Sequence, residues 1–118
     1  MSSVKQVSNE SFNHDVLQSP VPVLVDFYAD WCGPCRLLAP TLQRLSTEFA
    51  DRARIVKVNI DREPELADQF QVESIPTLVF VAGGRVVGRT SGVASEASLR
   101  NALSQLAGRA STPQRHVG

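Results

Sequence analysis

The only two cysteines of the chain lie in the pentapeptide Trp31-Cys32-Gly33-Pro34-Cys35. Two thiols separated by two residues can close a small disulfide ring and open it again, which makes the pair a reversible two-electron switch. The preceding apolar run is typical of a buried strand. Pro34 fits the first turn of a helix because a backbone N–H has no helical partner there. Gly33 leaves room for the backbone of a partner. Cys-x-x-Cys at such a junction is typical of a redox site.

The two cysteines are predicted to have unequal roles. The thiolate, not the thiol, attacks a disulfide, and the free N–H groups and dipole at a helix N-terminus stabilise an anion. We therefore assign Cys32, at the start of the helix, as the nucleophile. Cys35 lies one turn further in, so we expect it to be more shielded and to act as the resolving thiol. It would attack the mixed disulfide on Cys32 and release the reduced substrate.

Two other roles for the pair follow from residue type alone. Free cysteines are often small buried hydrophobic residues without chemistry. A structural zinc ion needs four ligands, and beyond the two cysteines the chain offers only His14 and His116. These histidines fall in a predicted first helix and in a polar C-terminal tail. No metal site is therefore expected.

Length and composition are those of one small globular domain of 118 residues, 42% hydrophobic and 20% charged. A chain of this size can bury roughly two thirds of its unfolded surface. The 12 basic and 12 acidic residues balance, which argues against nucleic acid or an anionic membrane as partner. No apolar stretch approaches the ~20 residues that cross a bilayer, and the polar N-terminal segment does not resemble a secretory signal. We expect a cytoplasmic protein, where persistent structural disulfides are rare.

Hydrophobic periodicity predicts alternating strands and helices. Strands are expected at 4–7, 21–28, 55–60, 77–82 and 85–88, the last two joined by a Gly83-Gly84 turn. Helices are expected after a cap at Ser8 or Ser11, at 34–49, from Pro64, and after a cap at Ser95. These elements predict an α/β fold with a mixed central sheet and helices on both faces. The polar segment 108–118 has no periodicity and is predicted to be a flexible, disordered tail.

Several separate segments, in the same order along the chain, resemble the thioredoxin family over about residues 4 to 107. They are Asp26-Phe27-Tyr28-Ala29-Asp30-Trp31-Cys32-Gly33-Pro34-Cys35, Lys57-Val58-Asn59-Ile60-Asp61, Ile75-Pro76-Thr77, Gly83-Gly84 and Gly92. The resemblance implies a thioredoxin fold in a domain spanning 1–107, with about five strands and about four helices. It further implies a monomeric reductase of protein disulfides that binds no cofactor. A thioredoxin reductase would recharge the Cys32–Cys35 disulfide, so that NADPH is used indirectly.

Asp26 interrupts an otherwise apolar predicted strand. A buried carboxylate is poorly solvated when charged, so we expect the pKa of Asp26 to lie above its usual range. Position alone would equally allow a solvent-facing carboxylate. The resemblance implies the buried role, in which Asp26 accepts and donates the proton of Cys35 directly or through a water molecule. Lys57 in the neighbouring strand is expected to pair with Asp26 and modulate its pKa, with a plain surface lysine as the alternative.

The Ile75-Pro76 bond is implied by the resemblance to be cis, although only about 5–6% of X–Pro bonds in folded proteins are cis. The cis-proline loop would offer the Ile75 backbone to an extended substrate, as in strand addition. The residues expected to bind substrate form an apolar surface around Cys32: Trp31, Gly33, Pro34, Ile75, Pro76 and Gly92.

Two classes of function stay open from the sequence. The first is a general dithiol reductase, favoured by the intact cysteine pair together with Asp26 and Pro76. The second is a binding or scaffold subunit with the same fold, in which redox turnover is incidental. Among redox enzymes, an oxidase or isomerase of this family typically carries His between its cysteines. The Gly33-Pro34 dipeptide therefore favours reduction.

Overall fold

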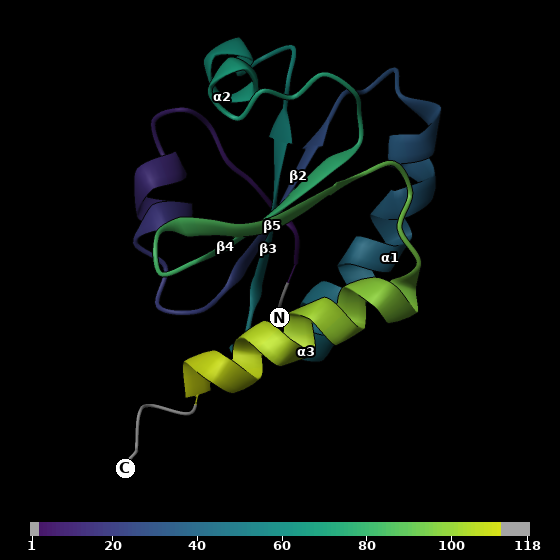
Figure 1. Ribbon diagram of the computed structural model, residues 1–118. Coiled ribbons are helices and arrows are strands. Elements are labelled where there is room, and N and C mark those ends of the chain that lie inside the picture. Colours follow the sequence, from purple (N-terminus) through teal and green to yellow (C-terminus); the bar gives the residue numbers. More distant parts are fainter. Residues whose placement is uncertain (1–2, 112–118) are drawn as a thin grey trace.

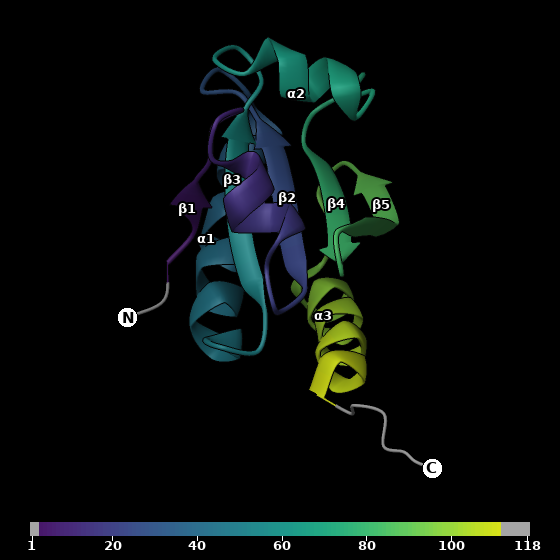
Figure 2. The same cartoon turned by 90° about the vertical axis from the view of Figure 1, so that its left-hand side faces the viewer.

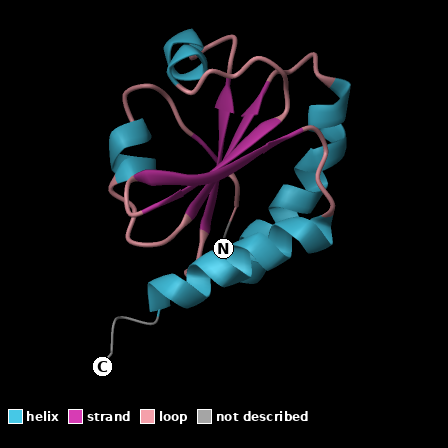
Figure 3. Ribbon diagram, viewed as in Figure 1, coloured by secondary structure: helices cyan, strands magenta, loops and turns pink. Residues whose placement is uncertain are grey.

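The computed structural model describes residues 3–111, in which a five-stranded mixed sheet lies between two helical layers (Figures 1 and 3). The strands are β1 (Lys5–Gln6), β2 (Val23–Tyr28), β3 (Arg54–Asn59), β4 (Thr77–Ala82) and β5 (Arg85–Ser91). The helices are η1 (Asn13–Leu17), α1 (Gly33–Phe49), α2 (Pro64–Gln69) and α3 (Glu96–Ser111). Five strands and four helices confirm the predicted architecture.

The central strand β2 carries the chain to the cysteine pair. The sheet order is β1-β3-β2-β4-β5, with β1, β3 and β2 parallel and β4 antiparallel to β2. Because β2 is hydrogen-bonded on both edges and covered on both faces, it can be apolar almost throughout. This accounts for the nearly unbroken apolar run that predicted the strand.

Alternate side chains of β2 supply the two separate cores. Val23, Val25 and Phe27 pack with η1 and α2, where Phe70 lies 5.5 Å from Phe27 between ring centroids. Leu24 faces the other way, into the core formed with α1 and α3. Figure 2 shows this layering, with η1 in front of β2 and β3 and α1 behind them. The two-residue period of a strand places Asp26 on the α1 side with Leu24.

Several element ends differ from the sequence prediction. The expected N-terminal helix is a single π-helical turn, η1, whose N-cap residue Phe12 makes no side-chain cap bond. Ser8 and Ser11 instead cap the turn before it: Ser8 Oγ accepts the Ser11 N–H at 3.2 Å, and Ser11 Oγ accepts the Ser8 N–H at 3.0 Å. β5 runs to Ser91 and not to residue 88, since its pairing with β4 continues as far as Thr77. The cap predicted at Ser95 is confirmed, as its Oγ accepts the Ser98 N–H at 3.1 Å.

The last helix also extends beyond its predicted end. α3 continues to Ser111, so residues 108–111, which were predicted to belong to a disordered tail, are helical. The rest of the predicted tail, 112–118, lies outside the described residues. Within residues 3–111, no helix is both long and apolar enough to cross a membrane.

Ala50, at the C-terminal end of α1, has a backbone φ of 46° and ψ of −109°. A side chain makes such a conformation unfavourable by roughly 1–3 kcal/mol, and glycine adopts it freely at an entropic cost of about 0.5–1 kcal/mol. We expect Ala50→Gly to raise the free energy of unfolding by about 1 kcal/mol in denaturant titrations. Ala39→Gly, at an exposed position within α1, is the control and should lower it by about as much. Equal losses in both variants would contradict the prediction.

Candidate active site

The cysteine pair lies where β2 ends and α1 begins. Cys32 is the N-cap of α1, with extended backbone, and its Sγ accepts a hydrogen bond from the backbone N–H of Cys35 at 3.2 Å. Pro34 stands in the first turn, as predicted. Cys32 and Cys35 are joined by a disulfide, with their Cα atoms 5.3 Å apart. The structure therefore holds the pair in its oxidised form at the start of a 17-residue helix.

The N-cap position distinguishes the two sulfur atoms chemically. The side chain of an N-cap accepts backbone N–H groups that have no helical partner, and an anion there is further stabilised by the helix dipole. Only Sγ of Cys32 occupies this place. Burial does not separate the two residues, since each is 4% exposed. The expectation that Cys35 is the more shielded residue is thus not confirmed in the disulfide form.

The loop before β4 approaches Cys32 from the other side. The Ile75-Pro76 peptide bond is cis, as the resemblance implied. The carbonyl oxygen of Ile75 lies 3.9 Å from Cys32 Sγ. The Ile75 side chain packs against the buried cluster of Ala29, Cys32 and Cys35. Pro76 itself is buried, so it does not contribute exposed surface. Its carbonyl accepts the Gly92 N–H at 2.9 Å, which brings Gly92 to the same loop.

Trp31 forms the exposed rim beside Cys32, with 67% of its surface accessible. Its indole N–H donates to Asp61 Oδ2 at 2.8 Å. Asp61 is held in turn by Asn59, a buried residue at the end of β3 whose Oδ1 accepts the Asp61 backbone N–H at 2.9 Å. Sequence reasoning assigned no role to Asp61 or Asn59. Their position could have indicated a role. Because β3 is parallel to β2, residues at the C-terminal end of β3 lie at the same edge of the sheet as the cysteine pair.

The remaining predicted surface residues are accessible. Pro34 is exposed and Gly33 partly so, and a Cβ built on Gly33 would meet nothing within 4 Å. Gly92 has a φ of 83°, which explains the glycine at this position. Leu37 and Val93 are further apolar side chains exposed by 75% and 54%. Leu37 was not among the residues predicted near the substrate, because exposure cannot be read from residue type.

Asp26 is buried at 5% exposure, and its Oδ1 has no hydrogen-bond partner in the described part of the chain. Burial raises the pKa of this carboxyl to about 7, and the nearby charge of Lys57 opposes the rise. The solvent-facing alternative is therefore wrong. A cavity of about 320 Å³ between α1 and the sheet is lined by Asp26, Lys57, Pro40 and Gln43, among other residues. Asp26 and the buried Cys35 thus both belong to the interface between α1 and the sheet.

Lys57 lies beside Asp26 in the sheet, as the two residues are register partners in β3 and β2. Its Nζ lies over the Tyr28 ring, 5.4 Å from the centroid. No ion pair connects Lys57 with Asp26 within residues 3–108, whose side chains the structure describes. Lys57 thus acts on Asp26 through charge at a distance and not by the direct pairing that was expected.

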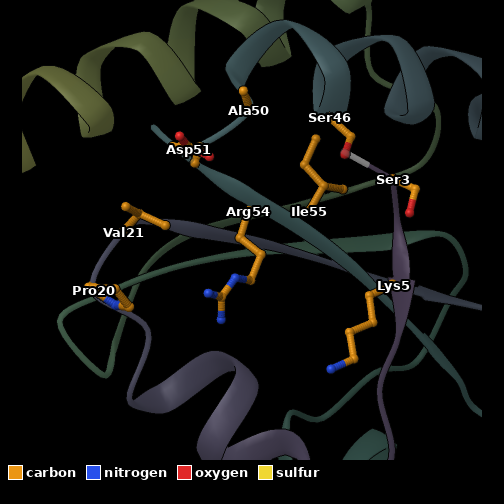
Figure 4. Close-up of a pocket in the computed structure, with 10 residues that line it drawn as sticks. Ser3, Lys5, Pro20, Val21, Ser46, Ala50, Asp51, Arg54 and Ile55 are labelled. Carbon is orange, nitrogen blue, oxygen red and sulfur yellow. The ribbon is translucent and has the colours of Figure 1, made fainter. Parts of the chain in front are cut away.

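A larger cavity, of about 600 Å³, lies at the opposite end of the parallel strands (Figure 4). Its cationic side chains, Lys5 and Arg54, point toward η1. There Lys5 Nζ lies 3.1 Å from Asp15 Oδ2, and Arg54 Nη1 donates to the Asp15 carbonyl at 2.7 Å. Their charges are thus engaged with Asp15, and the cysteine pair does not line this cavity.

Metal-binding side chains do not gather around the cysteines. In the described residues, no three His, Cys, Asp or Glu side chains lie close enough together to hold an ion. His14 contacts Asp15, with Nδ1 3.1 Å from Oδ1. His116 lies outside the described residues.

Comparison with known proteins agrees with this geometry. The family model described as Thioredoxin matches residues 3–105. Thioredoxin from Synechocystis sp. is 44% identical over 103 residues, which cover 87% of this chain and 96% of the relative. Thioredoxin from Mycobacterium bovis is 45% identical over 105 residues, covering 89% of this chain and 90% of the relative.

Two further similarities bear on fold and partner. A bifunctional thioredoxin reductase/thioredoxin from Mycobacterium leprae is 44% identical over 101 residues, 86% of this chain and 22% of that protein. The solved structure of a mutant thioredoxin from Halobacterium salinarum superposes with a TM-score of 0.80 at 34% identity, covering 89% of this chain and 91% of that one. With the Cys32–Cys35 disulfide at the N-terminus of α1, the chain belongs to the thioredoxin family and is a thiol–disulfide oxidoreductase that reduces protein disulfides.

Proposed function

We propose that reduction proceeds by two exchanges, with Cys32 as nucleophile and Cys35 as resolving thiol. The Cys32 thiolate attacks one sulfur of a substrate disulfide, forming a mixed disulfide and releasing the other sulfur as a thiolate. The Cys35 thiolate then attacks Cys32 Sγ and releases the second substrate sulfur. The substrate gains two electrons and two protons, and the chain becomes the Cys32–Cys35 disulfide. The observation that carries this assignment is the N-cap position of Cys32, which accepts the Cys35 N–H.

Asp26 is the proposed proton acceptor for Cys35 in the second exchange. Its raised pKa, about 7, is suited to proton transfer near neutral pH. The cavity beside it offers a path for the proton between the α1–sheet interface and solvent. Lys57 lines the same cavity and tunes the acidity of Asp26 through its charge.

The proposed substrate surface surrounds Cys32. An extended segment of an unfolded or flexible protein would pair with the Ile75 backbone by strand addition. Trp31, Gly33, Pro34 and Gly92 would flank it, while buried Pro76 shapes the loop without touching substrate. Few charged groups are needed for such contacts, which suits partners of many sequences.

The reductant is proposed to be NADPH, used indirectly through a thioredoxin reductase. Support comes from the M. leprae relative, whose name joins reductase and thioredoxin in one protein. We further propose that the chain works as a monomer in the cytoplasm, with electron transfer to protein disulfides as its role.

A coupled assay tests this proposal. With NADPH, a bacterial thioredoxin reductase and insulin as disulfide substrate, the wild-type chain should cause NADPH oxidation in proportion to insulin reduced. The Cys32→Ser variant, matched in size at the same position, should cause none. The contrary outcome is a wild-type chain that supports no NADPH oxidation by the reductase and also reduces no insulin when dithiothreitol replaces the reductase. In that case a binding or scaffold role would account better for the fold.

A further inference from the structure

The segment of residues 70–76, which we call the 70–76 loop, connects α2 to β4 and ends beside Cys32. Its C-terminal end is held by the sheet. Thr77 Oγ1 donates to the Ser74 carbonyl at 2.5 Å, and Gly92 N–H donates to the Pro76 carbonyl at 2.9 Å. These bonds fix the residues on either side of Ile75, whose backbone lies nearest to the reactive sulfur.

At the N-terminal end of the 70–76 loop, the backbone takes a conformation that is unfavourable by itself. Gln71 has a φ of 54°, in the left-handed region that residues with a Cβ rarely adopt. The last carbonyl groups of a helix have no partner within it, and α2 ends just before, at Gln69. The Gln71 and Val72 N–H groups close the end of α2 on the Asp68 and Ala67 carbonyls, at 3.0 and 2.9 Å. The carbonyls of Phe70 and Gln71, which follow this closure, are left to bond a group from elsewhere in the fold.

Arg89 provides that group. Its Nη1 donates to the Phe70 carbonyl at 2.8 Å, and its Nη2 lies 3.4 Å from the Gln71 carbonyl. The planar guanidinium fork suits two neighbouring acceptors and loses little freedom for each bond it makes. The Phe70 ring is partly buried and packs against the core, 5.3 Å from the Phe12 ring between centroids.

Arg89 belongs to the same β4–β5 hairpin that holds the other end of the 70–76 loop. Arg89 lies on β5 opposite Val79 of β4, with which it is paired in the sheet. One rigid hairpin thus holds both ends of the 70–76 loop, through Thr77 and Gly92 at one end and Arg89 at the other. The partners of the Arg89 side chain lie on this loop and not on the dithiol.

We propose that Arg89 is a positioning residue, which holds the 70–76 loop so that the Ile75 backbone meets a protein substrate beside Cys32. This inference rests on the proposed function, because it takes the 70–76 loop as the substrate-binding element. Arg89 is expected to affect binding of an extended chain and to leave the chemistry of the cysteines unchanged.

The test compares Arg89→Gln with Arg85→Gln, a matched loss of charge at an exposed position on the same strand. We expect Arg89→Gln to raise KM for insulin by about fivefold at unchanged kcat, the pattern for lost binding that is equal in ground and transition states. Its rate with a small aromatic disulfide should equal that of the wild type. Arg89→Lys should recover part of the KM, because an ammonium can donate to one carbonyl. Hydrogen exchange should speed up at the Gln71 and Val72 amides, which bond to Asp68 and Ala67.

Several results would overturn the inference: an unchanged KM in Arg89→Gln, an equal loss with the small disulfide, or the same effect in Arg85→Gln. Should Arg89→Gln fail to fold, the KM for insulin and the amide exchange of Arg89→Lys replace its measurements. Wild-type values of both in Arg89→Lys would then count against the inference. A wild-type chain that cannot reduce insulin would instead refute the proposed function. Hydrogen exchange of the 70–76 loop needs no turnover, so it tests the contact separately.

Discussion

Cys35→Ser is expected to accumulate stable mixed disulfides with protein substrates through Cys32, whereas Cys32→Ser forms none and has no turnover. The first exchange needs only Cys32, the N-cap of α1, and the second needs Cys35 to displace the substrate. Without Cys35 the reaction stops at the covalent intermediate. Mass spectrometry of the trapped species should locate the bond at Cys32.

Alkylation of the reduced wild-type chain provides an independent measure of the same asymmetry. Under limiting iodoacetamide, Cys32 should be labelled before Cys35, because the helix N-terminus favours the thiolate at the N-cap. Since both residues are 4% exposed in the disulfide form, access alone gives no reason for a difference. Faster labelling of Cys35, or trapped substrate in the Cys32→Ser variant, would reverse the assigned roles.

Asp26→Ala is expected to stabilise the fold at pH 7 and above and to slow disulfide exchange. Burial raises the pKa of Asp26 from 3.8 to about 7, a difference worth about 4 kcal/mol. Between these two values the native state holds more protons than the unfolded state, so the stability contributed by Asp26 falls as pH rises. It is fully present below pH 3.8 and lost above about 7. Removing the carboxyl should therefore raise the free energy of unfolding by about 2–4 kcal/mol at pH 8. The small cavity left by the substitution offsets part of this gain.

Denaturant unfolding at pH 3.5 and pH 8 measures this effect, and turnover at pH 7 measures the catalytic one. The gain should vanish at pH 3.5, and turnover should fall by about tenfold or more as the proton acceptor is lost. Asp15→Ala is the matched control, since Asp15 is equally buried at 5% exposure. Burial would raise the pKa of Asp15, but hydrogen bonds from His14 and Lys5 outweigh it and lower the pKa. Asp15→Ala should therefore lose stability at neutral pH. A destabilised Asp26→Ala with wild-type turnover would refute the role of Asp26.

Sequence was most informative where one residue type dictates local structure. The apolar run before Asp26 predicted a strand buried on both faces, and that burial in turn predicted the raised pKa. Pro34 and the cysteine spacing predicted the helix start. The Gly83-Gly84 turn predicted the hairpin, because both glycines take positive φ, 60° and 78°. In each case the physical cause lies within a few residues along the chain.

The rest of the site depends on contacts between distant segments. The bond from Trp31 to Asp61 spans 30 residues and that from Arg89 to Phe70 spans 19, and neither leaves a periodic pattern in the sequence. Lys57 shows the same limit. Its place beside Asp26 followed from neighbouring strands, but its side chain lies over Tyr28 and makes no direct pair with Asp26. The cis bond before Pro76 was expected only from the family resemblance, because residue type alone favours trans.

The central claim is that Cys32 and Cys35 together reduce a protein disulfide, and a single-turnover reaction tests it most directly. The fully reduced chain, freed of reductant, is mixed with an equimolar amount of insulin, quenched with acid, and both proteins are analysed by thiol titration and mass spectrometry. We predict that insulin gains two thiols for each chain that forms the intramolecular Cys32–Cys35 disulfide. Insulin that gains no thiols, while both cysteines of the chain stay reduced, would contradict the account.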